Sequence, residues 1–141
     1  MERLKERLAV AQHALASLQE VLAIRSPSLL ERDAAIQRFE YTVEAIWKAA
    51  QRYLDVTQGL SAGSPKAAVR FSRQIGLLSD QQATHALEMI DDRNLTVHTY
   101  NEELAEHIYS RLPRHAALLS TWLTSLTVLE QPRQRQRSRK R

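Results

Sequence analysis

Four side chains that could take part in chemistry stand within eight residues of one another in a chain that is otherwise rich in helix-forming residues. They are Arg93, Asn94, His98 and Tyr100, in the order Arg-Asn-x-x-x-His-x-Tyr. An arginine neutralises a phosphate, a histidine moves protons near neutral pH, and an asparagine orients either group. These side-chain types are what a ribonuclease needs if it works without a metal ion.

The chemistry that fits them is transesterification of RNA. One His98 would remove the proton from a ribose 2′-hydroxyl and a second would protonate the leaving 5′-oxygen, because imidazole has an ordinary pKa near 6.5. Arg93 would hold the scissile phosphate as its charge builds, and Asn94 would hold an imidazole ring or a phosphate oxygen. On a continuous helix, residues five positions apart do not face one point. A two-fold axis would bring Arg93 of one copy near His98 of another, so the motif predicts a homodimer.

A plainer interpretation gives the motif no chemical role. Arg93 would then form an ion pair with Asp91 or Asp92, and His98 would be an exposed or capping side chain. The spacing of arginine and histidine does not by itself decide between the two interpretations.

Composition limits the classes of protein to which the chain can belong. Its 141 residues are enough for one domain with one core, and 43% hydrophobic with 26% charged residues is a globular balance. The absence of cysteine excludes disulfides and thiolate sites. The first residues are charged, unlike a signal peptide, and the apolar segment 116–129 is too short and too rich in hydroxyls to span a bilayer. We therefore expect a soluble, cytoplasmic protein.

The positive charge of the chain is concentrated in its last residues. The tail holds six positive charges of a net +4, so the remainder of the chain is at −2. A basic segment can bind RNA through phosphates without sequence preference, but it can equally be a solvated end. The candidate nucleic-acid-binding residues are Arg133, Arg135, Arg137, Arg139, Lys140 and Arg141.

Apolar residues recur at steps of three and four along most of the chain, and no segment alternates with period two. This pattern predicts an all-α, antiparallel up-and-down bundle of four to five helices over residues 1–130, followed by a basic disordered tail over 131–141. Capping boxes begin helices after Ser28 and Ser79, and Ser64-Pro65 begins a shorter one. We expect a break near residues 99–102 and an interruption at Pro113. The helices predicted on these signals span about 2–24, 29–54, 65–77, 80–94, 102–112 and 114–129.

Three separated segments of the chain resemble one known family. They are LEMIDDRNLTVHTYNEELA (87–105), RFEYTVEAIWK (38–48) and SPK (64–66). The first looks like the signature of HEPN-domain proteins, and together they resemble the branch called nucleotidyltransferase substrate-binding proteins, or the HepT-like toxin family. The similarity runs from about residue 4 to 129 and leaves out the basic tail.

The resemblance implies a helical homodimer that acts with a minimal, MntA-like nucleotidyltransferase. In that family the Arg-x4-His pair, here Arg93 and His98, is the site of a metal-independent endoribonuclease. The tyrosine two positions after the histidine, here Tyr100, is where the partner attaches AMP. The chain would then be the toxin and the nucleotidyltransferase its antitoxin, with RNA as the substrate and no cofactor or metal of its own. A bulky anionic adenylate beside Arg93 and His98 would fill the phosphate site and repel RNA.

Three other functions compete with this one. The chain is not expected to be the nucleotidyltransferase, because Gly63-Ser64 is not followed by the Asp-x-Asp pair that holds magnesium. It could be a non-catalytic subunit that presents a substrate to the partner, in which case binding would survive His98→Ala. It could also be a structural bundle whose polar motif only joins two copies, in which case Arg93→Ala would dissociate them.

Overall fold

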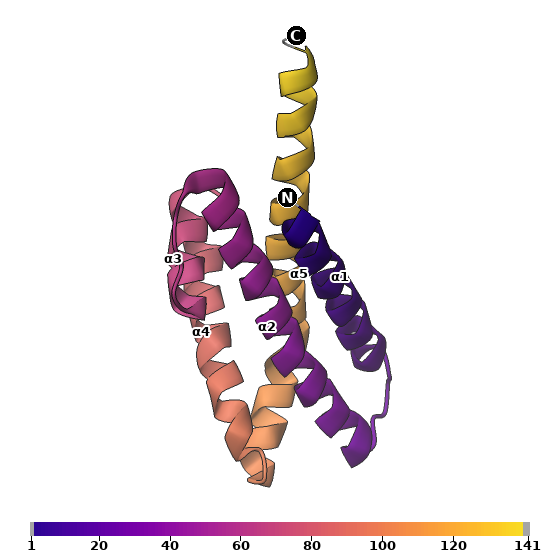
Figure 1. Cartoon of the computed structure of the whole chain (residues 1–141). Coiled ribbons are helices and arrows are strands. Elements are labelled where there is room, and N and C mark those ends of the chain that lie inside the picture. The colour runs from indigo at the N-terminus through magenta and orange to yellow at the C-terminus, as the bar shows by residue number, and fades with distance from the viewer. Residues whose placement is uncertain (1, 140–141) are drawn as a thin grey trace.

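A computed structural model describes the backbone of residues 2–139 and the side chains of residues 2–128. Within that part of the chain the elements are five α-helices and one short 3-10 helix, with no strand (Figure 1). The all-α bundle expected from the sequence is confirmed. In chain order the elements are α1 (Glu2–Leu22), α2 (Leu29–Gln58), α3 (Pro65–Gln74), α4 (Asp80–Leu95), η1 (Thr96–His98) and α5 (Glu102–Arg139).

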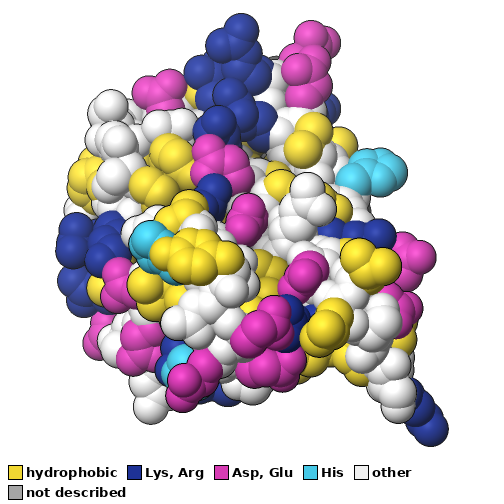
Figure 2. Space-filling view, turned by 90° about the horizontal axis from the view of Figure 1, so that it is seen from below, with side chains coloured by type: hydrophobic (Ala, Val, Ile, Leu, Met, Phe, Trp, Pro, Cys, Tyr) yellow, Lys and Arg dark blue, Asp and Glu magenta, His cyan; other side chains and the backbone are white. Residues whose placement is uncertain are grey.

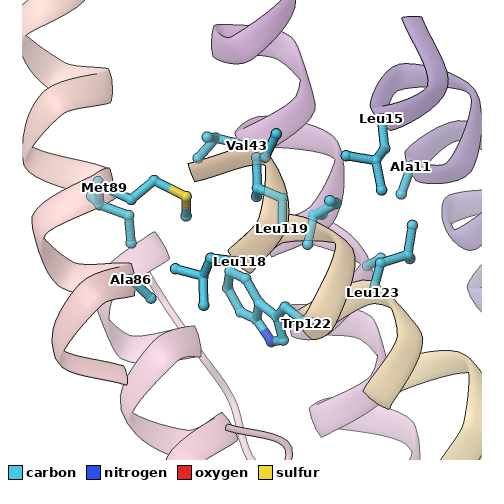
Figure 3. Close-up of a cluster of buried hydrophobic side chains, with 14 of the residues drawn as sticks. Ala11, Leu15, Val43, Ala86, Met89, Leu118, Leu119, Trp122 and Leu123 are labelled. Carbon is cyan, nitrogen blue, oxygen red and sulfur yellow. The ribbon is translucent and has the colours of Figure 1, made fainter. Parts of the chain in front are cut away.

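The core lies where α5 packs between α1 and α2 on one side and α4 on the other. Figure 3 shows Leu118 and Trp122 of α5 pointing toward α4, whereas Leu123 points toward Ala11 and Leu15 of α1. Trp122 is fully buried. Each large apolar side chain buried in this way stabilises the fold by roughly 1.5–3 kcal/mol. Packing on both sides therefore holds α5 in place, and this helix begins directly after the turn that carries the Arg-x4-His motif.

The helix starts follow the local signals in the sequence. The Ser28 hydroxyl accepts from the Glu31 N–H at 3.1 Å, and the Glu31 carboxylate accepts from the Ser28 N–H at 2.9 Å. Ser79 and Gln82 repeat this arrangement at 3.1 and 2.8 Å, so both predicted capping boxes are confirmed. At the other end of α2, Gly59 adopts φ +66°, a left-handed conformation that closes helices and favours glycine.

Pro113 does not interrupt the last helix, so the prediction of two separate helices there was wrong. α5 runs without a break from Glu102 to Arg139, and Pro113 is exposed on its outer side. A proline in a helix removes one hydrogen bond and crowds one carbonyl. Here Leu112 and Ala116 are buried on either side of it, and their packing outweighs that local cost.

The backbone of α5 stays helical beyond residue 130, where the sequence suggested that the bundle ends and a disordered tail begins. The glutamines and arginines of this segment are good helix formers. Lys140 and Arg141 lie outside the described residues, as do all side chains after residue 128. None of the helices in the described part is long and apolar enough to cross a membrane.

Candidate functional site

The Arg-x4-His motif lies where α4 ends and the chain turns toward α5, at the lower end of the bundle in Figure 1. The turn is held by its own hydroxyls: Thr96 donates to the Arg93 carbonyl at 2.6 Å and Thr99 donates to the Thr96 carbonyl at 2.8 Å. The Asn101 side chain then accepts from the Leu104 N–H at 3.1 Å and begins α5. The break predicted near residues 99–102 is confirmed. Arg93 is thus on α4, whereas His98 is in the 3-10 turn.

His98 and Tyr100 lie against each other on the surface. The His98 Nδ1 and the Tyr100 hydroxyl are 3.2 Å apart, and the two rings meet edge to face. Tyr100 is 81% exposed, and Leu95 and Val97 beside it are also exposed. In Figure 2, which looks onto this end of the bundle, apolar and acidic side chains are mixed, with groups of Lys and Arg at the upper and left margins. His98 and Tyr100 are therefore accessible to a large ligand.

The guanidinium of Arg93 is not neutralised by either of the aspartates that precede it. Asp91 is bound to Lys66, with 2.7 Å between its carboxylate oxygen and Nζ. Asp92 is bound to Arg111 at 2.8 Å. No described residue makes a hydrogen bond or ion pair with the half-buried Arg93 guanidinium. The interpretation in which Arg93 pairs with one of its neighbouring aspartates is therefore wrong.

The structure does not join all the predicted catalytic residues within one copy. No hydrogen bond among the described residues connects the side chain of Arg93 or Asn94 with His98, and Asn94 is exposed. Only His98 and Tyr100 are in direct contact. In a single chain these side chains thus do not form a complete catalytic site.

Glu44 of α2 lies within electrostatic reach of Arg93. Burial disfavours ionisation of Glu44, but hydrogen bonds from Trp47 and Lys48 outweigh it, and the Arg93 charge adds to them. The pKa of Glu44 is therefore lowered. Its carboxylate oxygens lie 2.9 Å from Trp47 Nε1 and 3.2 Å from Lys48 Nζ. Glu44 can thus attract Arg93 toward α2 without forming a direct bond with it.

A buried polar network lies behind the motif and joins α4 to α5. His115 Nε2 is 2.8 Å from Asp92, and His115 Nδ1 is 3.0 Å from His85 Nε2. Phe39 of α2 stacks on His115. Burial lowers the pKa of His115 more than the bond with Asp92 raises it, and burial together with the neighbouring His115 lowers the pKa of His85. The network holds the residue directly before Arg93.

The sequence motif alone did not indicate the roles of Glu44, Asp92 and His115. A signal existed for His115, because it lies on the apolar stripe of α5 between Leu112 and Leu119. A polar residue on such a stripe requires a buried partner. Neither Asp92 nor Glu44 has a comparable signal, since each binds side chains whose positions depend on tertiary packing.

A second ion-pair cluster fastens the start of α5 to the start of α2. Arg32 is buried, and its guanidinium lies 2.8 Å from Glu102 and 2.7 Å from Glu106, with Asp33 at 2.9 Å. Hydrogen bonds to Glu102 and Glu106 raise the pKa of Arg32 in spite of burial. The turn that carries His98 and Tyr100 is thus anchored on both sides, by this cluster and by the network around Asp92.

An open hollow of about 600 Å³ adjoins the motif along the first turns of α5. Two of its lining residues are glutamates, so it would repel the phosphates of RNA. We do not assign the RNA site to this hollow. Its lining residues are Asn101, Glu103, Leu104, Glu106 and His107.

The six basic residues of the tail were the other predicted nucleic-acid contacts. The side chains of Arg133, Arg135, Arg137 and Arg139 lie outside the described part of the structure, as do Lys140 and Arg141. RNA binding by the tail therefore stays a prediction.

Comparison with known proteins assigns the chain to a family. The sequence model of the protein family described as "Nucleotidyltransferase substrate binding protein like" matches residues 6–128. A crystal structure of a protein from Thermus thermophilus is 55% identical, with a TM-score of 0.79, over 82% of this chain and 98% of that one. No curated protein sequence matches the chain.

Two further solved structures share the fold. HI0074 from Haemophilus influenzae, described as revealing the fold of a substrate binding domain of a nucleotidyltransferase, is 27% identical with a TM-score of 0.72, over 85% of this chain and 98% of that one. A tri-AMPylated Shewanella oneidensis HEPN toxin in complex with its MNT antitoxin has a TM-score of 0.72 over 89% of this chain and 96% of that one. At 16% identity, the second likeness shows a common HEPN fold and no more. Because the family model matches residues 6–128, the chain belongs to the "Nucleotidyltransferase substrate binding protein like" family, and it shares its fold with a HEPN toxin.

Proposed function

We propose that this chain is the toxin-like component of a pair with a minimal nucleotidyltransferase, and that it is a metal-independent endoribonuclease. The observation that carries the proposal is the state of Arg93. Its guanidinium stands next to two aspartates, yet both are bound elsewhere, to Lys66 and to Arg111. A guanidinium that no carboxylate binds directly, five residues before an exposed histidine, is suited to hold a phosphate.

The reaction cleaves the RNA backbone by transesterification. His98 takes the proton of the ribose 2′-hydroxyl, and the 2′-oxygen forms a bond to phosphorus while the bond from phosphorus to the 5′-oxygen breaks. A second His98 protonates the 5′-oxygen. Arg93 stabilises the charge that builds on the phosphate oxygens, and Asn94 orients the phosphate or the imidazole. The products end in a 2′,3′-cyclic phosphate and a 5′-hydroxyl.

The second His98 comes from a second copy of the chain. In one copy no described contact joins Arg93 to His98, so a complete site requires two copies around a two-fold axis. Leu95, Val97 and Tyr100 are exposed by 41%, 66% and 81%, which is apolar surface that such an interface could cover. We therefore propose a homodimer with the motif at its two-fold axis.

Tyr100 is the residue through which the partner would control this site. The proposed step is attack of the Tyr100 hydroxyl oxygen on the α-phosphorus of a nucleoside triphosphate held by the partner. The bond from that phosphorus to the bridging oxygen breaks, pyrophosphate leaves, and the hydroxyl proton passes to His98. The exposure of Tyr100 makes that attack possible, and its hydroxyl lies 3.2 Å from His98. An attached AMP would occupy the place of the RNA phosphate and add negative charge there. That a HEPN toxin of this fold is AMPylated in complex with an MNT antitoxin supports the proposal.

A second candidate function is that of a non-catalytic, substrate-binding subunit of a nucleotidyltransferase. The likeness to HI0074, at 27% identity, favours it because that protein is described as such a domain. In this case the chain would bind its ligand at the same end of the bundle but would cut no RNA.

Cleavage of a mixed RNA in the presence of EDTA distinguishes the two functions. The protein must be produced without its partner and shown by mass to carry no AMP. We expect the wild type to cut and His98→Ala to be slower by at least about 100-fold, because general acid–base groups contribute that much. His13→Ala is the matched control, since His13 is an exposed histidine of α1. Both variants should melt near the wild-type temperature.

Two outcomes would contradict the ribonuclease. If the AMP-free wild type does not cut, the substrate-binding function takes its place. If His98→Ala cuts as fast as His13→Ala, then another nuclease or another residue is responsible.

A further inference from the structure

A second concentration of positive charge lies away from the Arg-x4-His motif, between the start of α1 and the last turns of α2. It surrounds a hollow of about 240 Å³. In Figure 1 these parts of α1 and α2 lie toward the opposite end of the bundle from the turn between α4 and α5. The lining residues are Arg3, Arg7, Gln51, Arg52, Asp55, Ser61 and Ala62.

The three arginines of this hollow are largely unpaired. No described residue makes a hydrogen bond or ion pair with the guanidinium of Arg3 or Arg7. Arg52 Nε is buried and has no hydrogen-bond partner among the described residues. The ion pair of Arg52 with Asp55, at 3.5 Å, is a solvent-accessible pair within one helix, and pairs of this kind contribute little. The guanidiniums of Arg3 and Arg7 thus offer N–H donors for which the described part of the chain supplies no acceptor, whereas the buried Arg52 Nε is reached by a ligand only if its side chain moves.

The balance of charge at this site stays positive when the nearby carboxylates are included. Asp55 lines the hollow, and Glu6 lines an adjoining hollow of about 280 Å³ together with Arg3 and Arg7. Three guanidiniums therefore face two carboxylates. The Ser61 hydroxyl adds a further hydrogen-bonding group at the rim. A small space with arginine forks and a hydroxyl matches a phosphate group better than an extended acidic peptide.

The position of the hollow on α2 relates it to the motif. Glu44, whose carboxylate feels the charge of Arg93, precedes Arg52 by eight residues on the same helix. At 1.5 Å per residue this is about 12 Å along the helix axis. Lys48 lies between them. Eight residues also turn the helix by about 80°, so a single RNA strand with one phosphate at Arg93 would pass partly around α2 to place another in the hollow.

We propose that the hollow lined by Arg3, Arg7 and Arg52 is a phosphate-binding subsite that holds the RNA backbone away from the cleaved bond. The identity of the ligand as RNA rests on the proposed function, whereas the preference for a phosphate rests on the hollow itself. The subsite carries no base contacts, so it adds affinity and salt dependence without sequence preference.

The test is binding of a fluorescent 2′-O-methyl RNA oligonucleotide to the full chain, followed by anisotropy at several KCl concentrations. This RNA has no free 2′-hydroxyl and is not cut, so the measurement does not depend on catalysis. We expect Arg3→Gln/Arg7→Gln to weaken binding by about tenfold or more. The slope of log K against log[KCl] should become shallower by about 0.7 for every phosphate that the variant no longer neutralises. Arg52→Gln should act in the same direction.

The matched control is Arg25→Gln/Arg70→Gln, which removes two exposed arginines that lie outside the hollow. It should change affinity by less than about threefold and leave the salt slope as it is. If both double variants weaken binding equally, only net charge matters and the subsite is excluded. The melting temperature of every variant shows whether it has folded, and Arg52→Gln on α2 tests the site independently of the residues at the start of α1.

Other results would overturn the proposal in different ways. If inorganic phosphate or AMP binds to the hollow but the variants bind RNA like the wild type, the site serves a free phosphate or nucleotide. If the variants lose only the nucleotidyltransferase partner, the hollow is a protein contact. Failure of the proposed ribonuclease would appear separately, as the absence of cleavage of unmodified RNA by a wild type that still binds the oligonucleotide.

Discussion

Among single residues, Tyr100 combines exposure with closeness to a group that can move protons. It is 81% exposed, and its hydroxyl lies 3.2 Å from His98 Nδ1. A tyrosine hydroxyl is a poor nucleophile while it keeps its proton, and a neighbouring imidazole can accept that proton. Tyr100, which would accept the AMP, and His98, which the AMP would silence, are therefore in direct contact.

Replacing this hydroxyl tests the proposed control by the partner. We expect Tyr100→Phe to gain no AMP when it is mixed with the nucleotidyltransferase, ATP and Mg²⁺, because the acceptor oxygen is gone. Intact-protein mass spectrometry follows the transfer. Tyr41→Phe is the control, since Tyr41 is an exposed tyrosine on α2 that bonds with Ser17. AMP on Tyr100→Phe at the wild-type level would place the acceptor elsewhere.

At the scale of single helices, α5 keeps a proline in its interior. The ring of Pro113 cannot donate to the carbonyl of Tyr109, four residues earlier, and crowds it. The helix nevertheless continues, because α5 has buried side chains on both sides of Pro113, from Ala105 to Leu126, and these pack in the core. The proline is thus a local cost that the packing of a long helix overcomes.

This cost can be measured by substitution. We expect Pro113→Ala to raise the free energy of unfolding by about 1–2 kcal/mol. The helix regains a hydrogen bond, although the unfolded chain also becomes more flexible. Urea denaturation monitored by circular dichroism gives the value. Pro65→Ala is the matched control, because Pro65 opens α3 at the position that suits proline, and its loss should be neutral or destabilising. A destabilised Pro113→Ala would mean that the ring itself packs usefully.

For the molecule as a whole, the protonation of two histidines makes the stability of the fold depend on pH. His85 and His115 lie between α4 and α5, and burial lowers the pKa of both, with the Arg114 charge adding to the effect. In the unfolded chain they return to about 6.5. At pH values between the lowered pKa values and about 6.5, the unfolded state therefore binds more protons than the folded state.

Stability should consequently fall as the pH is lowered through that window. We expect the free energy of unfolding to be higher at pH 7.5 than at pH 5.5, with each histidine contributing at most about 1.4 kcal/mol per pH unit. Urea denaturation across this range gives the slope. His85→Gln should make the slope shallower, whereas His13→Gln, at an exposed site, should leave it unchanged. Equal slopes in all three proteins would exclude the histidine network as the cause.

What the sequence by itself determined is local. The serine caps at residues 28 and 79, the break after the motif and the apolar stripes all depend on residues within one or two turns, so neighbouring positions were enough to predict a helical bundle and most of its helix starts. Resemblance over three segments added the family, which the match over residues 6–128 confirms. The residues of the motif could be selected by type and spacing, although their roles stay proposals.

What only the tertiary structure decided concerns side chains far apart in the sequence. Asp92 meets Arg111 and His115 from 19 and 23 residues away, and that pairing leaves Arg93 without this carboxylate. The hollow lined by Arg3, Arg7 and Arg52 joins the start of α1 to the end of α2. Pro113 is helical because of core contacts that its neighbours in sequence do not reveal. Such outcomes depend on which helix faces pack together, and a periodic pattern shows that a face is buried but does not show against which partner.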